Sequence, residues 1–388
     1  AGADLAEANV AVGFDAGEAK IEKISYARAE NAEALENVKI RTNGGTLTVN
    51  AAKDSVDHYN TADKVDITAV APNSYHEYGD VLALVVSQGR VVINEGATIK
   101  TVVVTSATPE VIVPKGADTT VYAPEENKNI KGTEPKKIAA TPSSADITAI
   151  VNGAKYFAGG SGTEADPYLI ATGEHAYNMR DGKGYFKLID DVVVANEIYM
   201  SKKTYVVDLN GHSVKLEYAD GVKPNNGSVF YIAGKGGQLT INDSSEAQTG
   251  AVIGSDKTYS NKVTSAVRAG KYGKLIINGG HFYGTSEGTS CIFVLTSRAS
   301  STKATVTING GIFETATPSN GIYYVLNHQD NTTTGCTITV NGGKFKNYNP
   351  GVTTVDPVNA KTGKIVLGTG CTTTSEVIGS DTWYTVSK

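Results

Sequence analysis

The stretch TVTINGGIF, residues 305–313, is one of three near-identical phrases in this chain. KLIINGGHF occupies 274–282 and TITVNGGKF occupies 337–345. Each phrase joins an alternating apolar run to Asn-Gly-Gly, one variable residue and Phe. A phrase that returns with its turn residues and its aromatic residue in the same places indicates a repeated structural unit.

Two further copies extend the repeat toward the N-terminus. VVDLNGH places Asn210, and QLTINDS places Asn242, in the slot that Asn278, Asn309 and Asn341 occupy in the three clear copies. The five asparagines are then spaced by 32, 36, 31 and 32 residues. Asn-Gly between alternating apolar residues is also a hairpin signal, but an antiparallel sandwich imposes no constant period. The spacing therefore favours a repeat architecture.

Each period also holds a second apolar run after the Phe. SVFYIAG at 228–234, SCIFVLT at 290–296 and GIYYVLN at 321–327 occupy this place. About three short strands then fit in each period, and three strands per turn of chain describe a parallel β-helix. The sequence therefore predicts an all-β fold, a β-solenoid.

In a β-helix the Asn-Gly-Gly phrase would form one corner of every coil, because Asn and Gly tolerate left-handed backbone. The Phe two residues after the glycines would point inward, so Phe282, Phe313 and Phe345 should stack on one another. Strand alternation places further apolar residues inside. These are Ile277, Val306, Ile308, Ile338 and Val340.

The N-terminal part follows a related pattern. NGGTLTV at 43–49 resembles the repeated phrase, and short β-branched runs return about every ten residues. The runs are Val91–Ile93, Val102–Val104, Val111–Val113 and Thr120–Tyr122. We therefore expect a solenoid with shorter coils over 38–123.

The remaining segments are predicted to cap or connect these parts. Residues 15–37 are rich in Ala, Glu and Lys, with Ile21 and Ile24 on helical spacing, so residues 1–37 should form an N-terminal cap with a short helix. The polar, proline-containing segment 124–158 reads as a linker or excursion. A parallel β-helix with coils of about 32 residues should follow over 159–388.

Composition excludes several classes of function. The 388 residues carry 35 Lys and Arg against 40 Asp and Glu, a net charge of −5, which does not suit a nucleic-acid-binding protein. The longest apolar run, Val81 to Val86, is far shorter than the about 20 residues of a membrane span. Cys291, Cys336 and Cys371 match no metal-binding spacing and are expected to be mostly buried thiols, so no metal or cofactor is predicted.

From residue 160 the chain reads GSGTEADPYLI, then YFKLIDDV at 185–192 and DLNGH at 208–212. These phrases resemble the entry segment of bacterial cell-surface and secreted proteins of the right-handed parallel β-helix, or pectate-lyase-like, class. The resemblance covers about 159–346 and implies the handedness of the solenoid. Members of this class include adhesin-like proteins, polysaccharide lyases, glycosidases and phage tail spikes, so the resemblance leaves the activity open.

The residues offer little sign of catalysis. Depolymerising enzymes gather carboxylates on one exposed face, and the outward positions two before each Asn slot contain a single one. These positions are Asp208, Thr240, Ile276, Thr307 and Thr339. Asp190 and Asp191 read as turn residues, and His212 and His281 as solvated or turn-bonding histidines. Arg268 and Arg298 have no acid that the sequence places beside them, so no catalytic residue is assigned.

Aromatic side chains provide the alternative signal. Tyr231, Tyr323 and Tyr324 lie in the second apolar run, and a row of outward tyrosines along a solenoid would form a sugar-binding strip. Together with Asp208 they are the predicted ligand-binding residues. The predicted function is that of an extracellular, surface-displayed β-helix protein that binds a glycan or a host or cell-surface ligand without catalysis.

Two other functions remain open at this point. A phage tail spike or capsid fibre would share the solenoid and would usually be a trimer. A polysaccharide lyase or glycoside hydrolase would share the fold and add a carboxylate cluster, which loops such as those with Glu287 and Glu314 would have to supply. Neither the ligand nor the oligomeric state follows from the sequence.

Overall fold

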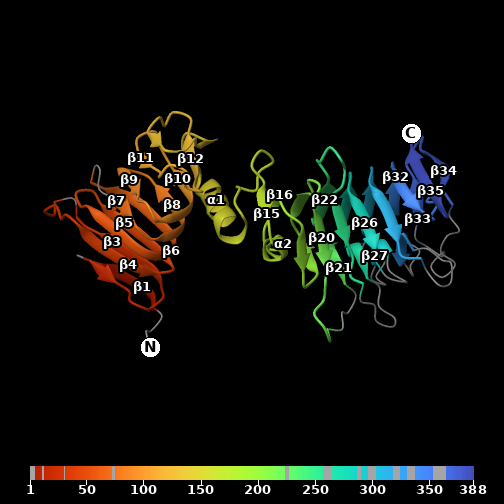
Figure 1. Ribbon diagram of the computed structural model, residues 1–388, viewed down its shortest axis with the longest axis horizontal. Helices are drawn as coiled ribbons and strands as arrows, with labels where there is room; N and C mark the ends of the chain where they lie inside the picture. Colours follow the sequence, from red (N-terminus) through yellow and green to blue (C-terminus); the bar gives the residue numbers. More distant parts are fainter. Residues whose placement is uncertain are drawn as a thin grey trace. The chain divides into compact units, whose positions relative to one another are not determined.

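The computed structural model describes residues 5–10, 13–29, 31–71, 75–222, 227–256, 264–285, 290–295, 303–317, 324–329, 337–352 and 364–388. The chain divides into two compact units, Ala1–Ser161 (unit 1) and Gly162–Lys388 (unit 2). Both units are built mainly from parallel β-strands (Figure 1). The prediction of an all-β fold is confirmed. The second unit begins at Gly162, whereas the sequence places its start at Gly159.

The described residues of unit 1 form one sheet of 14 strands in which every pairing is parallel. The strands are β1 (Leu5–Val10), β2 (Phe14–Asp15), β3 (Ile21–Ala27), β4 (Val38–Asn43), β5 (Thr46–Ala51), β6 (Val56–Val70), β7 (Tyr75–Glu77), β8 (Asp80–Val86), β9 (Arg90–Ile93), β10 (Thr98–Val104), β11 (Glu110–Ile112), β12 (Thr120–Pro124), β13 (Ile130–Lys131) and β14 (Lys136–Ile138).

The long strand β6 connects the two sides of unit 1. Its first half pairs with β4 and β7, and its second half pairs with β5 and β8. Beyond β6, strands alternate between the two sides, so each repeat adds one strand to each. Thr101 pairs with Thr120, 19 residues later. Side chains from both sides, among them Ile40, Leu47 and Val65, form one buried cluster, because alternation turns every second residue inward.

The helix predicted within 15–37 is wrong. Residues 21–27 form strand β3, which pairs with β1 and β5, and the remaining described residues of this segment are not helical. Ile21 and Ile24 have helical spacing, but Ile24 and Tyr26 are both buried on one face of the strand. Pairing with β5 on one side and β1 on the other outweighs the weak helix preference of Ala, Glu and Lys.

The segment 124–158, which the sequence interprets as a linker or excursion, contains β13, β14 and helix α1 (Ser144–Tyr156). A capping box closed by Asp146 begins this helix. The side chain of Ile150 packs against Val85 and Val103, which lie on the outward face of β8 and β10. α1 therefore covers part of the outward face of the unit 1 sheet.

The described residues of unit 2 form three sheets. Successive strands along the chain belong to these sheets in turn. The first sheet comprises β15 (Tyr168–Ile170), β16 (Gly184–Leu188), β19 (Thr204–Asp208), β22 (Gln238–Asn242), β25 (Lys274–Ile277), β28 (Thr305–Ile308), β31 (Thr337–Val340) and β33 (Lys364–Leu367). The second comprises β17 (Val192–Val194), β20 (Ser213–Leu216), β23 (Ala251–Ile253), β26 (His281–Gly284), β29 (Ile312–Thr315), β32 (Gly343–Lys346), β35 (Asp381–Ser387) and β34 (Thr372–Ile378). The third comprises β18 (Ile198–Ser201), β21 (Ser228–Ala233), β24 (Ser265–Ala269), β27 (Ser290–Leu295) and β30 (Leu326–Gln329).

The repeated asparagines of unit 2 occupy equivalent positions in successive repeats, as predicted, and their side chains form a hydrogen-bonded ladder that was not predicted. The Nδ2 atom of Asn309 donates to Oδ1 of Asn278 at 2.8 Å, and Nδ2 of Asn341 donates to Oδ1 of Asn309 at 2.8 Å. Asn278 donates in the same way to Asn242 at 2.7 Å. One side-chain amide per repeat thus bonds the next, because equal spacing puts these residues in register.

The repeated phenylalanines are stacked inside unit 2. Phe282, Phe313 and Phe345 are fully buried, with ring centroids 5.1 and 4.8 Å apart and interplanar angles of 10° and 8°. This prediction is confirmed. The inward positions expected from strand alternation are buried as well, namely Ile277, Val306, Ile308, Ile338 and Val340.

The left-handed corner residue differs from the expectation. In the three clear copies it is the second glycine, with φ of +97° at Gly280, +107° at Gly311 and +117° at Gly343, and the asparagine is not left-handed. A Cβ added at Gly311 would lie 2.9 Å from the carbonyl oxygen of Gly280. The second glycine is therefore needed for its backbone, while the asparagine serves the ladder.

Both ends of unit 2 depart from the repeat. Helix α2 (Gly173–Asn178) begins at Thr172, whose Oγ1 accepts a hydrogen bond from the backbone N–H of His175 at 3.2 Å, and it packs against β15 and β17. At the other end, β34 and β35 form an antiparallel hairpin that pairs with β32. Each element covers or extends strands that begin or end a sheet.

Candidate functional site

Asp208 is the last residue of β19, in the first sheet. The pairing of β19 with β22 shows that the sequence placed Asp208 in the wrong outward row. Asp208 pairs with Asn242, and Val206 pairs with Thr240. Asp208 therefore begins the column that continues into the Asn ladder, while Val206 occupies the place assigned to Asp208 in the row of Thr240. The sequence misaligned this copy by two residues because Asn210, rather than Asp208, matches the Asn-Gly motif.

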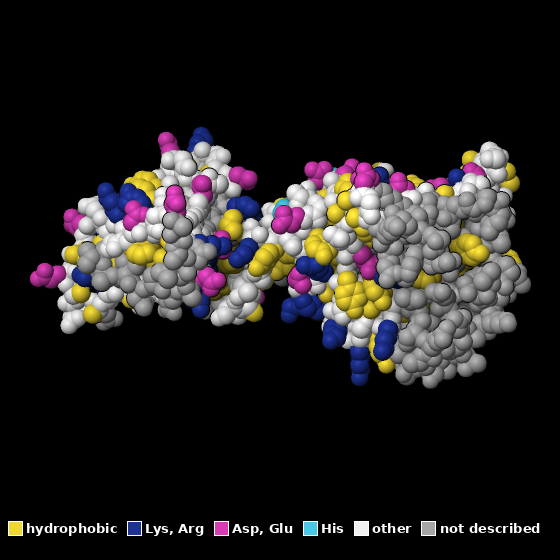
Figure 2. Space-filling model, turned by 90° about the horizontal axis from the view of Figure 1, so that it is seen from below, with side chains coloured by type: hydrophobic (Ala, Val, Ile, Leu, Met, Phe, Trp, Pro, Cys, Tyr) yellow, Lys and Arg dark blue, Asp and Glu magenta, His cyan; other side chains and the backbone are white. Residues whose placement is uncertain are grey.

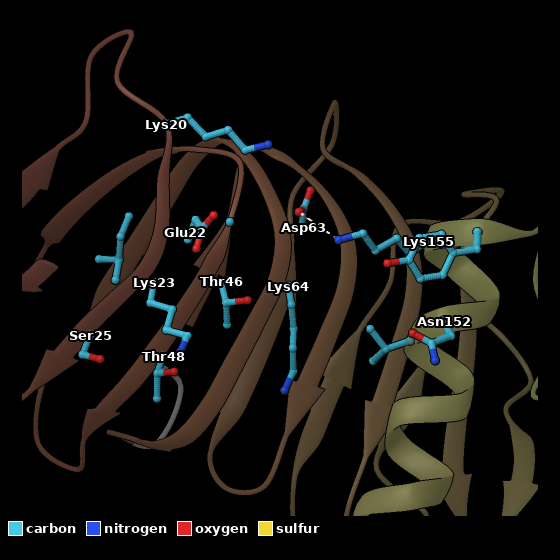
Figure 3. Close-up of a pocket in the computed structure, with 14 residues that line it drawn as sticks. Lys20, Glu22, Lys23, Ser25, Thr46, Thr48, Asp63, Lys64, Asn152 and Lys155 are labelled. Carbon is cyan, nitrogen blue, oxygen red and sulfur yellow. Dashed lines mark hydrogen bonds and ion pairs between the residues drawn. The ribbon is translucent and has the colours of Figure 1, made fainter. Parts of the chain in front are cut away.

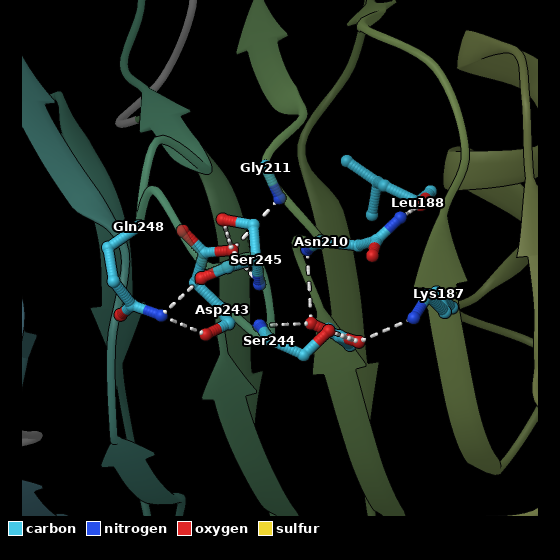
Figure 4. Close-up of polar contacts among 9 residues, drawn as sticks. Lys187, Leu188, Asn210, Gly211, Asp243, Ser244, Ser245 and Gln248 are labelled. Atoms are coloured by element: carbon cyan, nitrogen blue, oxygen red, sulfur yellow. Dashed lines mark hydrogen bonds and ion pairs between the residues drawn. The ribbon is translucent and has the colours of Figure 1, made fainter.

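The Asp208 carboxylate is bonded by its own turn and by residues of the neighbouring repeats (Figure 4). It accepts hydrogen bonds from the backbone N–H of Ser244 at 2.8 Å, from Ser244 Oγ at 2.6 Å and from the backbone N–H of Asn210 at 3.0 Å. Lys187 Nζ lies 3.4 Å away. These contacts tie neighbouring repeats together. A ligand-binding role for Asp208 stays a prediction, and the contacts give it a structural role.

A second acid at this corner, Asp243, was missed by sequence reasoning. Its side chain is buried and accepts hydrogen bonds from the backbone N–H groups of Gly211 at 2.9 Å and Gly250 at 2.7 Å, and from Ser245 Oγ at 2.8 Å (Figure 4). The Asp-Ser-Ser sequence after Asn242 was the available signal, since Asp commonly bonds backbone N–H groups in turns.

The third sheet holds an outward row of side chains that we call the tyrosine–arginine row, consisting of Tyr199, Tyr231 and Arg268. These residues lie in β18, β21 and β24 and are paired in register. Ring centroids of Tyr199 and Tyr231 are 5.1 Å apart, and Cζ of Arg268 lies 3.9 Å from the Tyr231 centroid. Tyr199 is 48% exposed, so the row opens to solvent at this end.

A carboxylate from an earlier part of the chain holds Arg268. Nη2 of Arg268 lies 2.8 Å from both carboxylate oxygens of Glu197, which also accepts the backbone N–H of Ser228 at 3.0 Å. Although Arg268 is only 6% exposed, its Nε has no hydrogen-bond partner within the part of the chain that the structure describes. A buried guanidinium N–H without an acceptor is costly, and this atom is closed to solvent.

Burial sets the ionisation of the groups around the row. It raises the pKa of Tyr218 to about 12, with the Glu197 carboxylate contributing, and it also raises the pKa of Tyr231, against the effect of Arg268. Burial likewise raises the pKa of Glu197, while Arg268 and the Ser228 N–H lower it. The tyrosines therefore remain neutral hydroxyl groups well above neutral pH.

The predicted tyrosine strip is realised only in part. Tyr231 belongs to the row, Tyr324 is half-buried two residues before β30, and Tyr323 lies outside the described residues. Tyr199 was missed, although its place between the buried Ile198 and Met200 indicates an outward side chain.

The second sheet carries a separate polar cluster. His281 Nε2 lies 2.5 Å from Glu314 Oε1, and Tyr283 OH lies 2.6 Å from His281 Nδ1. Lys346 Nζ lies 3.4 Å from Glu314 and 3.0 Å from Asp381. The hydrogen bond from His281 lowers the pKa of Glu314. His281 is thus held within the sheet face, rather than being a solvated or turn-bonding residue.

Other candidate chemistry is limited in the described residues. No group of three or more His, Cys, Asp or Glu side chains there is arranged to hold a metal ion. Burial raises the pKa of the Cys291 thiol, whereas Cys371 is half-buried and Cys336 lies outside the described residues. Glu287 lies outside them too.

No helix in the part of the chain that the structure describes is long and apolar enough to cross a membrane. Comparison with known proteins adds no relative: no family model, no curated protein and no solved structure matches this chain.

Proposed function

We propose that unit 2 is a right-handed parallel β-helix, displayed outside the cell, whose tyrosine–arginine row binds a glycan without cleaving it. The three-strand repeat, with parallel strands in all three sheets, supports this fold. Right-handedness is proposed because connections between parallel strands of one sheet are right-handed in the great majority of proteins. The resemblance of 159–346 to secreted and cell-surface proteins supports the extracellular location.

The observation that carries the glycan proposal is the exposed ring of Tyr199 beside the ring of Tyr231, which Arg268 holds in place. Tyr199 and Tyr231 supply amphipathic ring surface, which suits the apolar faces of sugar rings. The Arg268 guanidinium packs on the Tyr231 ring, with Cζ 3.9 Å from the ring centroid, and holds that ring in place. These side chains come from rigid, paired strands, so the site is organised before a ligand arrives.

A binding role is favoured over catalysis by the state of the acids. Hydrolysis of a glycosidic bond uses two carboxyl groups at a defined separation. Glu197 is bonded to Arg268 and Ser228, and Asp208 and Asp243 are bonded within their corner. These carboxylates brace the structure, which leaves them poorly suited to transfer protons to a substrate.

Binding of full-length protein to a panel of neutral and acidic glycans tests this proposal, with product analysis in the same samples. Tyr199→Ala should weaken binding about threefold to tenfold, the range that corresponds to about 0.5–1.5 kcal/mol for one ring contact. Arg268→Lys, which keeps the charge and loses the planar donors, should weaken it as well.

Tyr272→Ala is the matched control, because it removes a ring that is 38% exposed from the turn between β24 and β25. It should bind like the unaltered protein. Equal binding by Tyr199→Ala would contradict the site, and release of shortened products would contradict a purely binding role.

A further inference from the structure

A groove of about 660 Å³ lies in unit 1, between the outward face of the sheet and the last turns of α1 (Figure 3). Lys23, Thr46 and Lys64 come from the face of β3, β5 and β6, and Asn152 and Lys155 come from the helix. The groove exists because α1 packs over β8, β10 and β12 and leaves the faces of β3, β5 and β6 uncovered.

The floor of the groove is a ladder of hydroxyl and ammonium groups. Lys23 pairs with Thr46, which pairs with Lys64, and in the adjoining row Ser25 pairs with Thr48, which pairs with Asp66. Two strand spacings, about 10 Å, separate the backbones of Lys23 and Lys64. Within the described residues, the hydroxyls of Ser25, Thr46 and Thr48 and the ammonium of Lys23 have no hydrogen-bond or ion-pair partner, so each can bond a ligand.

The groove is basic in a protein of net negative charge. Four lysines and two acidic residues line it, whereas the whole chain has a net charge of −5. Two of these lysines are already paired with an acid: Lys155 with Asp63 at 3.3 Å, and Lys64 with Asp66 at 3.0 Å. On the face seen in Figure 2, Lys and Arg side chains also gather along the lower edge of unit 2. The excess of lysine among the residues that line this groove favours an anionic ligand.

The kind of ligand follows from which groups the groove presents. The backbones of β3, β5 and β6 are paired within the sheet, so a peptide cannot add to its face as another strand. Side-chain hydroxyl and ammonium groups remain, and these bond sugar hydroxyls and carboxylates. Glu22, Asp63 and Asp66 moderate the positive charge, which suits one carboxylate per sugar better than dense sulfation. We propose that this groove binds a carboxylated polysaccharide such as a polyuronate.

Titration of the full chain with polygalacturonate at low and high ionic strength tests the proposal. The double variant Lys23→Gln/Lys64→Gln should weaken binding about tenfold or more at low ionic strength, because each charge contact in water is worth about fivefold. The loss should shrink at high ionic strength, where salt screens the charges that remain. Lys23→Arg/Lys64→Arg should retain binding.

Lys100→Gln/Lys115→Gln is the matched control, because both lysines are exposed in unit 1 and neither lines the groove. It removes the same charge and should bind polygalacturonate normally. Equal losses in the two double variants would overturn the groove as the site. Unchanged binding after Lys23→Gln/Lys64→Gln would overturn it as well, and circular dichroism checks that each variant is folded.

Three other polymers separate the remaining alternatives. Neutral dextran should not compete with polygalacturonate for the groove, and heparin and polyglutamate should compete less well than polygalacturonate. Tighter groove-dependent binding of heparin or polyglutamate would overturn the assignment to a polyuronate. Tyr199→Ala leaves this groove intact, so failure at the tyrosine–arginine row and failure here give different results.

Discussion

Both units are built from repeats of parallel strands, but they differ in the number of strands per repeat. Unit 1 uses two strands, with 19 residues between the paired Thr101 and Thr120, while unit 2 uses three, with 31 or 32 residues between the clear asparagines. Unit 2 stabilises its repeats with identical contacts, the Asn ladder and the Phe stack. A near-constant repeat makes such ladders possible, because each residue then faces its own copy.

Unit 1 instead contains a buried polar network that occurs once. His58 lies 2.7 Å from Thr42 Oγ1 and 2.7 Å from Glu77 Oε1, and the Glu77 carboxylate also accepts hydrogen bonds from Tyr75 OH and Gly79 N at 2.8 Å. The side chains of His58 and Glu77 are fully buried. Such a network is sensitive to the loss of any member. We therefore expect mutations in the Phe stack to destabilise unit 2, and mutations in this buried network to destabilise unit 1.

The largest effect is expected from shortening the aromatic stack of unit 2. Phe313→Ala should lower the free energy of unfolding by about 3–5 kcal/mol, since it leaves a cavity between Phe282 and Phe345. The single tryptophan, Trp383, lies in unit 2 and reports its urea unfolding by fluorescence. A loss well under 1 kcal/mol would show that the stack contributes little.

An intermediate effect is expected from the buried network of unit 1. Glu77→Gln keeps the side-chain volume but replaces a carboxylate acceptor beside His58, and it should lower the free energy of unfolding by about 1–3 kcal/mol. The change should appear in the circular dichroism of urea unfolding and leave the Trp383 transition in place. A shift of the tryptophan transition by the same amount would indicate that the units unfold together.

The smallest effect is expected from the exposed asparagine ladder. Asn309→Ser should lower the free energy of unfolding by about 0.5–1.5 kcal/mol, since it removes hydrogen bonds to Asn278 and Asn341 that compete with water. Thr307→Ser, two residues earlier in β28 and outside the ladder, is the control for fluorescence-detected unfolding. Equal losses for the two variants would contradict a stabilising ladder.

Sequence patterns predicted the parts of the fold that repeat locally. The spacing of Asn278, Asn309 and Asn341 predicted their equivalent positions in successive repeats, and the following phenylalanines predicted the buried stack. The same reasoning failed where a pattern was shared by two structures: Ile21 and Ile24 fit a helix as well as a strand. It also failed at Asp208. The Asn-Gly motif at Asn210 suggested that Asn210 aligns with Asn242, whereas Asp208 is the residue that pairs with Asn242.

The candidate sites depend on contacts between residues that are far apart in the sequence, and no local sequence pattern predicts such contacts. Glu197 and Arg268 are 71 residues apart and meet because β18, β21 and β24 lie side by side. The groove of unit 1 likewise needs α1 to pack beside a sheet face formed much earlier in the chain. Periodicity in the sequence determines which residues turn inward, since alternation is a local property of a strand. Which outward residues become neighbours is decided by the pairing of whole repeats, whose connecting segments vary in length.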